Sequence, residues 1–190
     1  MSVPHEEKWN AILDAAYRVF GTKGFYETKM AEIAEEAGIA KGTLYLYFSS
    51  KEEMFLAMSR RDFAIFLDGL RTELSGSFTF REKLSCIAKH HMEYFFVRRK
   101  YERVFFNSGN NDPGMMDMLT EFLSDYMKIV SDVMEQEGLK KPLYLAKALS
   151  GILEAYKMDI LFAEGFGKEE LQDRVEFTVN LFLNGCRGSY

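Results

Sequence analysis

The segment from Lys41 to Phe48 combines side chains that could contact a nucleic acid. It reads Lys-Gly-Thr-Leu-Tyr-Leu-Tyr-Phe, and no Asp or Glu lies between Ala37 and Lys51. An ammonium, a hydroxyl and a glycine suit close approach to phosphates, and leucine and tyrosine suit apolar contact with thymine methyl groups. The segment offers no Arg, Asn or Gln for bidentate hydrogen bonds to bases. Because the whole chain has a net charge of −5, this local basic strip favours focused binding to phosphate over non-specific binding by the whole molecule.

Helical periodicity is expected to place these side chains on one face. At about 100° per residue, Leu44 and Phe48 point in nearly the same direction and should face a core. The opposite face then holds Gly42, Thr43 and Leu46, flanked by Tyr45 and Tyr47. This arrangement predicts a short helix whose exposed side is available to a partner.

Two helices are expected to precede this segment. Apolar residues at helical spacing and the stop at Gly24 predict a first helix that begins near Pro4. Thr28 is predicted as the N-cap of a short second helix through Ala37, which Gly38 ends. Two short helices joined by a glycine turn, behind a longer supporting helix, form the helix-turn-helix pattern, in which the later helix enters a major groove.

Residues 8–56 resemble the DNA-binding head of the TetR family of bacterial transcriptional regulators. The resemblance implies a dimeric repressor whose body releases DNA when a small molecule binds. The residues that carry it are Ile12-Leu13-Asp14-Ala15-Ala16, Phe20, Gly24-Phe25, Thr28, Ile33-Ala34, Ala37 to Phe48 and Lys51-Glu52-Glu53-Met54. From the resemblance and the local charge together, the candidate DNA-binding residues are Thr28, Lys29, Lys41, Gly42, Thr43, Tyr45, Leu46, Tyr47 and Lys51.

The remainder of the chain is also predicted to be helical. Capping boxes at Ser50–Glu53 and Thr79–Glu82 open two of its helices. The predicted helices run from Lys51 to about Leu74, from Thr79 to about Val97, from Arg98 to near Asn107, from about Met115 to Glu137, from Pro142 to about Ala163 and from about Lys168 to Asn184. We therefore expect an all-α protein with a three-helix head over residues 1–50 and a helical-bundle body for ligand binding and dimerisation over residues 51–190.

The abundance of aromatic residues and methionine in the body has two interpretations. Most of these side chains must form the core, but 15% aromatic residues and 11 Met could also line a pliable cavity for an apolar or amphipathic ligand. Glu154 and Asp159, on a mostly apolar helix, could supply polar contacts or could face solvent. The candidate cavity residues are Phe63, Phe66, Met92, Phe95, Phe96, Phe105, Tyr126, Met127 and Met158.

The last two long helices are the predicted homodimer interface. Both are apolar over more than one face, as expected for helices that pack on their own body and on a partner. Gly151 and Ala155 stand four residues apart and would let two backbones approach closely. The predicted partners are therefore a double-stranded DNA operator, a second copy of the chain and a small-molecule inducer.

Other functions have weaker support in the sequence. Cys86 and His90 stand at i, i+4, which suits a metal, but two ligands do not make a site, and we expect neither a metal nor a cofactor. The chain shows no nucleophile motif and no glycine-rich phosphate loop, so we do not expect an enzyme. The remaining alternative is an architectural or partner-binding protein without small-molecule control. Two cysteines, no apolar run of membrane-spanning length and no signal segment favour a cytoplasmic protein without a membrane partner.

Overall fold

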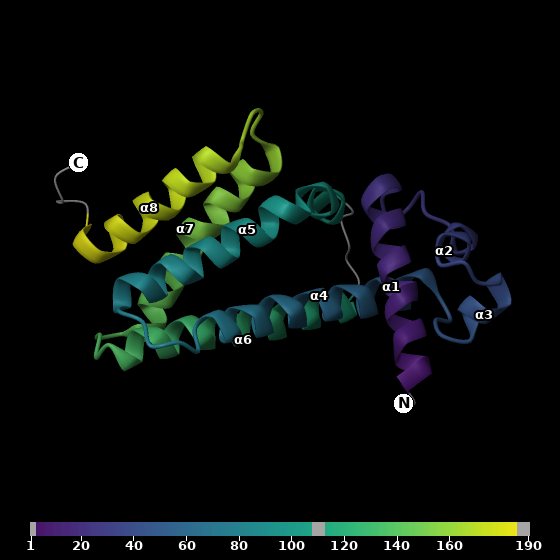
Figure 1. Cartoon of the computed structure of the whole chain (residues 1–190), viewed down its shortest axis with the longest axis horizontal. Helices are drawn as coiled ribbons and strands as arrows, with labels where there is room; N and C mark the ends of the chain where they lie inside the picture. Colours follow the sequence, from purple (N-terminus) through teal and green to yellow (C-terminus); the bar gives the residue numbers. More distant parts are fainter. Residues whose placement is uncertain (1–2, 108–112, 186–190) are drawn as a thin grey trace. The chain divides into compact units, whose positions relative to one another are not determined.

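The computed structural model describes residues 3–107 and 113–185, and these form eight α-helices without a β-strand (Figure 1). This confirms the predicted all-α class. The helices are α1 (Val3–Lys23), α2 (Met30–Glu36), α3 (Lys41–Tyr45), α4 (Lys51–Glu73), α5 (Phe80–Asn107), α6 (Pro113–Gln136), α7 (Pro142–Phe162) and α8 (Lys168–Asn184).

The chain forms two compact units that share three of these helices. The first unit comprises Met1–Ala64 and Lys100–Met118, and the second comprises Ile65–Arg99 and Leu119–Tyr190. Helices α4, α5 and α6 each begin in one unit and continue into the other. The predicted division between a head and a body at residues 50 and 51 stays a prediction.

An aromatic cluster forms the centre of the first unit. The rings of Phe20, Phe25 and Phe55 lie 5.1 to 5.8 Å apart, so they join α1, the turn after it and α4. Ile33 and Leu44 are fully buried on the inner faces of α2 and α3. The two short helices are therefore held by the side chains that they bury.

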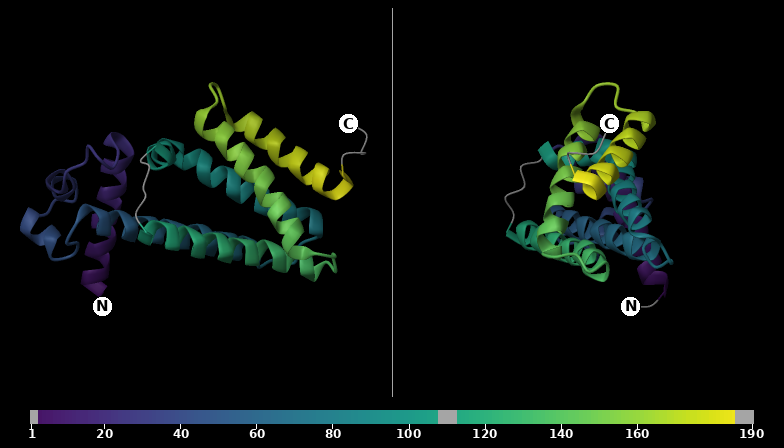
Figure 2. Two further views of the ribbon diagram at one scale, coloured as in Figure 1. Left: turned by 180° about the vertical axis from the view of Figure 1, so that it is seen from behind. Right: turned by 90° about the vertical axis from the view of Figure 1, so that its left-hand side faces the viewer.

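The second unit has one continuous apolar core. Side chains of α4, α5, α6, α7 and α8 contribute to it, and Leu84, Ile87, Met92, Val130 and Leu153 are each completely buried there. Figures 1 and 2 show α7 and α8 side by side, joined by the short turn at Gly165. α7 packs its buried face, which includes Leu149 and Ile160, into this core.

Three sequence predictions about individual elements are wrong. Lys29, not Thr28, is the N-cap of α2. α3 ends at Tyr45 instead of Phe48, and Leu46 and Tyr47 continue as a tighter turn with i to i+3 hydrogen bonds of 3.1 and 3.0 Å. Phe48 is nevertheless buried, because its N–H still donates to the Leu44 carbonyl at 3.0 Å.

The third wrong prediction is a helix break after Val97, because α5 is one helix through Asn107. The basic run at Arg98 does not interrupt it, since aromatic rings one turn earlier accommodate the guanidinium groups. Arg98 lies 4.1 Å from the Tyr94 ring centre, and Arg99 lies 4.3 Å from the Phe96 ring centre. Cation–π contacts of this kind favour the helix that places the two side chains on one face.

Candidate functional sites

The turn between α1 and α2 is fixed by buried hydrogen bonds. Gly24 adopts a left-handed backbone with φ of 87°, and its N–H donates to the Phe20 carbonyl at 2.8 Å, as expected for a glycine that ends a helix. The Thr28 hydroxyl donates to the Gly24 carbonyl at 2.6 Å, and Thr28 is only 2% exposed. Thr28 therefore shapes this turn from the inside.

Lys51, the first residue of α4, is anchored to the same turn. Its ammonium donates to the backbone carbonyls of Tyr26 at 3.2 Å and Thr28 at 3.1 Å, and lies 4.5 Å from the Phe25 ring centre. Carbonyl oxygens and an aromatic face both stabilise a positive charge. Lys51 thus joins the beginning of α4 to the turn that precedes α2.

The turn between α3 and α4 is held by the paired serines before Lys51. The Ser50 hydroxyl accepts the Glu53 N–H at 3.1 Å, as the predicted capping box requires. The reciprocal bonds come from Ser49, whose N–H and hydroxyl donate to the Glu53 carboxylate at 2.7 and 2.6 Å. These bonds hold the pKa of Glu53 below its usual value, so the carboxylate stays ionised and keeps the turn closed.

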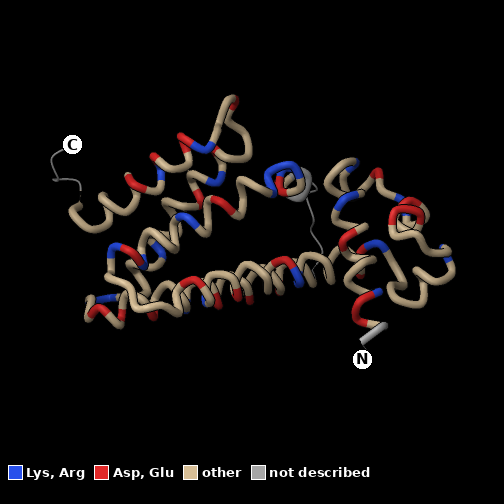
Figure 3. The backbone as a smooth tube through the Cα atoms, viewed as in Figure 1, with Lys and Arg blue, Asp and Glu red and all other residues tan. Residues whose placement is uncertain are grey.

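The predicted interface residues outside this framework lie on the surface of the first unit. Leu46 is 83% exposed and Tyr45 is 45% exposed, while Thr43 is half-buried. Lys29, Lys41 and Gly42 are exposed, and the Lys41 ammonium lies 5.8 Å from the Tyr45 ring centre. Figure 3 shows blue positions in the region of α3, and the sequence from Ala37 to Lys51 contains no Asp or Glu. Tyr47 is half-buried and stacks on the His5 ring at 4.8 Å.

The nine candidate cavity residues do not lie together in one place. Phe66, Met92, Phe95 and Tyr126 are buried in the core of the second unit, and Phe96 and Met127 pack against it. Met158 is 37% exposed, and Phe63 belongs to the first unit, where it is half-buried. The side chain of Phe105 lies outside the described residues. Of the two polar candidates on α7, Asp159 accepts a hydrogen bond from Arg174 at 3.2 Å, and Glu154 pairs with Lys157.

A polar group that the sequence did not single out lies inside this core. His91 on α5 is only 2% exposed, and its Nδ1 is 3.3 Å from the Tyr126 hydroxyl. Burial, together with the charges of Lys157 and His90, lowers the pKa of His91 to about 3. The imidazole is therefore neutral at physiological pH, and its 3.7 Å separation from Glu154 is not an ion pair. Nothing in the sequence distinguishes His91 from the adjacent His90 except its position on the wheel.

Cys86 and His90, the two residues at metal-ligand spacing, share a carboxylate instead. Glu73 lies 3.0 Å from His90 Nδ1 and accepts from the Cys86 thiol at 3.6 Å. Burial and this carboxylate raise the pKa of the thiol to about 11. Within residues 3–107 and 113–185, no group of three or more His, Cys, Asp or Glu is arranged to hold a metal ion.

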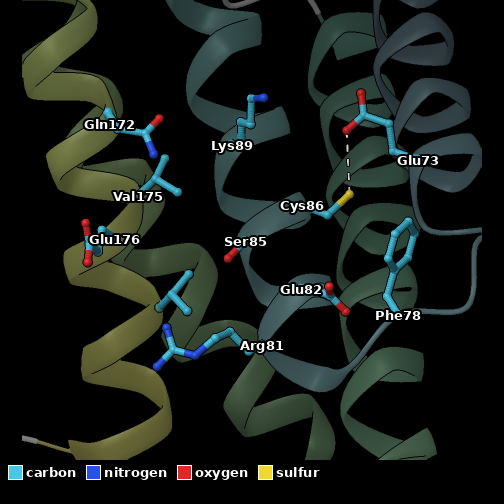
Figure 4. A pocket seen from close by; sticks show the side chains of 11 residues that line it. Glu73, Phe78, Arg81, Glu82, Ser85, Cys86, Lys89, Gln172, Val175 and Glu176 are labelled. Atoms are coloured by element: carbon cyan, nitrogen blue, oxygen red, sulfur yellow. Dashed lines mark hydrogen bonds between the residues drawn. The ribbon is translucent and has the colours of Figure 1, made fainter.

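Glu73 and Cys86 also line an open groove between α5 and α8 with a volume of about 560 Å³ (Figure 4). Arg81, Glu82 and Lys89 of α5 line it together with Glu176 of α8, so the groove carries both signs of charge. It offers no concentrated charge and no enclosed apolar surface. None of the helices that the structure describes has both the length and the hydrophobicity that crossing a membrane requires.

The fold and the exposed strip define a helical protein with a helix-turn-helix head, and comparison with known proteins agrees. Residues 12–58 match the family described as bacterial regulatory proteins, tetR family. The chain is 31% identical over 84 residues to the fatty acid metabolism regulator protein of Bacillus subtilis. The matched stretch covers 44% of this chain and 43% of that protein. The chain is 54% identical over 52 residues to the uncharacterised regulator YfiR of the same organism, covering 27% and 25% of the two chains.

The resemblance extends to the whole chain at the level of the fold. The structure of the fatty acid degradation regulator FadR from Bacillus halodurans covers 96% of this chain and 97% of its own, with a TM-score of 0.80 and 21% identity. FadR from Bacillus subtilis, solved in complex with stearoyl-CoA, covers 94% and 100%, with a TM-score of 0.78 and 19% identity. Residues 12–58 therefore match the TetR family of bacterial regulators in sequence, and the whole chain shares the fold of these solved structures. Its sequence matches span between a quarter and about half of the length of these curated relatives.

Lys51→Ala is predicted to destabilise the first unit. The substitution removes two charge-assisted hydrogen bonds and a cation–π contact from a half-buried position, so we expect a loss of roughly 1–2 kcal/mol in the free energy of unfolding. Chemical denaturation of both proteins measures this loss, and Lys41→Ala, which truncates an exposed lysine nearby, serves as the control. Equal stability of the two variants would contradict the anchoring role of Lys51.

Proposed function

We propose that this protein is a ligand-responsive transcriptional repressor that binds a palindromic operator as a homodimer and is released by an apolar or amphipathic molecule. The observation that carries the proposal is the exposed strip of α3 and its following turn on a supported helix-turn-helix head. A leucine side chain that is 83% exposed buries little apolar surface in the monomer, so it adds little to the free energy of unfolding. On a DNA-binding face it could meet the methyl group of a thymine.

The nine candidate DNA-binding residues have two different roles in this proposal. Lys29, Lys41 and Gly42 are exposed and suit phosphate contact, and Thr43, Tyr45, Leu46 and Tyr47 suit the groove. Thr28 and Lys51 hold the turn before α2, which fixes the angle at which α3 is presented. An ammonium has three N–H donors, and the two carbonyl bonds of Lys51 therefore still permit a phosphate contact.

The surface of α7 supports the proposed dimer. The exposed residues on the side opposite its core face recur at spacings of three and four and form one stripe, which suits a helix packed against a second helix. At its centre, a Cβ built on Gly151 would meet no atom within 4 Å. The stripe consists of Tyr144, Ala148, Gly151, Ala155, Met158 and Phe162. A second copy of the chain, related by a two-fold axis, would cover this stripe and bring two heads to half-sites about 34 Å apart or a multiple of that distance.

The ligand class follows from the core of the second unit and from the solved relative. Large aromatic side chains share this core with Met92 of α5, and such side chains suit contact with an apolar chain. The Bacillus subtilis FadR structure holds stearoyl-CoA. We therefore take long-chain acyl thioesters as the first ligand class for this protein.

Leu46→Ala is predicted to weaken binding to the operator selected from random duplexes by about five- to tenfold, since one apolar base contact contributes roughly 1 kcal/mol or more. Affinity for random DNA and the melting temperature should stay unchanged, because the side chain packs on nothing in its own unit. Val97→Ala, which truncates another exposed side chain (75% exposed) on α5, is the control for surface effects. Equal losses on operator and random DNA would rule out base contact by Leu46.

Gly151→Leu is predicted to weaken the homodimer without unfolding the monomer. A larger side chain at the centre of the stripe would hold two helices apart, while the monomer has open space at this position. Sedimentation equilibrium should show a dissociation constant at least tenfold higher than that of the wild type. Ser124→Leu, an equally bulky change at an exposed position of α6, should leave it unchanged. A monomeric wild type at micromolar concentration would overturn the dimer.

Stearoyl-CoA is predicted to release the operator. Allosteric coupling in proteins commonly changes affinity by about 5- to 150-fold, so saturating stearoyl-CoA should reduce operator affinity by at least fivefold in a fluorescence anisotropy titration. Free coenzyme A is the control for the nucleotide portion. Unchanged operator affinity with saturating ligand bound would favour the alternative, an architectural DNA-binding protein without small-molecule control.

A further inference from the structure

The core of the second unit contains polar atoms that the chain itself does not satisfy. The ring of His91 is surrounded by the rings of Phe66, Phe95 and Tyr126, whose centres lie 6.1, 5.0 and 5.8 Å away. Among the described residues, neither His91 Nε2 nor the Ser150 hydroxyl oxygen has a partner at the distance and angle of a normal hydrogen bond. Both residues are more than nine-tenths buried. Unpaired polar groups at such depth reduce stability, and they mark places where a function outweighs that cost.

The two unpaired atoms neighbour the same phenol. His91 Nδ1 is 3.3 Å from the Tyr126 hydroxyl. The Ser150 hydroxyl makes a long, weak hydrogen-bond contact with the phenol, and this contact lowers the pKa of Tyr126 against the larger rise that burial causes. Ser150 and Glu154 stand four residues apart and therefore share one side of α7. Helices α5, α6 and α7 thus each contribute one or more side chains to a single buried polar group.

The charges around His91 decide which ring nitrogen carries the proton. Because the imidazole is neutral, it has one donor and one acceptor. Glu154 Oε1 lies 3.7 Å from Nε2, which is too long for a hydrogen bond but favours a proton on that nitrogen. Tyr126 then donates its O–H to Nδ1, and the Nε2–H remains a donor without an acceptor.

We propose that His91 Nε2–H and the Ser150 hydroxyl bind the neutral carbonyl oxygen of an acyl ligand, and so select a thioester, ester or amide over the free acid. This inference rests on the proposed function, since it specifies how the ligand of that function is recognised. The apolar chain of the ligand packs among Phe66, Met92 and Phe95, next to the carbonyl.

Electrostatics disfavour a carboxylate at the same position. The imidazole is neutral, so it cannot balance a negative charge, and the ammonium of Lys157 already pairs with Glu154. Glu154 would repel a second carboxylate, which would also lose its hydration at a position as deep as that of His91. A neutral carbonyl accepts both hydrogen bonds without that penalty.

The test measures binding of three probes to the full chain by isothermal titration calorimetry. Stearoyl-CoA carries the carbonyl, S-octadecyl-CoA replaces it with a methylene group, and stearate carries a carboxylate. The wild type should bind stearoyl-CoA about tenfold more tightly than S-octadecyl-CoA, as expected when a buried donor loses its acceptor. It should bind stearate more weakly than stearoyl-CoA at pH 7.5.

His91→Phe should abolish the preference for the carbonyl while leaving affinity for S-octadecyl-CoA unchanged or improved, because an apolar ring replaces an unpaired donor. Because the Tyr126 hydroxyl also loses its acceptor in this variant, the ratio of the two CoA affinities, and not the melting temperature, is the quantity that decides the test. Ser150→Ala, a smaller change, should reduce the preference for stearoyl-CoA over S-octadecyl-CoA in part. This variant keeps the test decisive if His91→Phe does not fold. Glu93→Gln, at an exposed position on the same helix, should keep the full preference.

The outcomes separate this inference from the proposed function. Equal binding of stearoyl-CoA and S-octadecyl-CoA by the wild type would overturn carbonyl recognition while leaving a ligand-responsive repressor intact. A preference that persists in both His91→Phe and Ser150→Ala would overturn the assignment to these residues. Failure of the wild type to bind any of the three probes would overturn both the inference and the ligand class of the proposed function.

Discussion

The head of this protein depends on the burial of a few side chains by helices that could not form alone. α2 has seven residues and α3 has five, and isolated helices of such length are unstable in water. Full burial of Ile33, Leu44 and Phe48 contributes roughly 1.5–3 kcal/mol for each side chain. Lys51 adds a charged anchor between α4 and the turn before α2. The exposed strip can therefore vary in sequence at little cost in stability, whereas the residues beneath it cannot.

In the second unit, by contrast, some buried polar atoms lower the stability of the core. A core built only for stability would pair every buried polar atom or replace it with an apolar one. Here Leu84, Ile87 and Leu153 are packed as in an ordinary core, yet His91 and Ser150 keep unpaired atoms at the same depth. Natural proteins commonly retain such costs at binding sites, and the position of these atoms inside an aromatic core separates them from surface histidines and serines.

Much of this fold could be predicted from the sequence because its signals are local. Gly24, Gly38 and Pro142 mark helix ends through backbone constraints that need no tertiary contact, and α8 begins and ends at the predicted residues. The predicted break after Val97 was wrong because a basic run is not a backbone signal. Thr28 was misread as a cap because its hydroxyl bonds backwards to Gly24, which depends on the three-dimensional turn. His91 was missed since burial, not residue type, sets it apart from His90.

The proposed ligand control involves α4, a helix that contributes residues to both units. α4 begins at Lys51, which holds the turn before α2, and the same helix carries Phe66, whose ring lies 5.5 Å from that of Tyr126. Under the proposed function, a ligand beside Tyr126 would therefore meet a side chain of the same helix whose first residue is Lys51. Such a contact changes DNA binding only if the ligand favours one position of α4 over another. By linkage, the operator must then reduce the affinity for the ligand by the same factor.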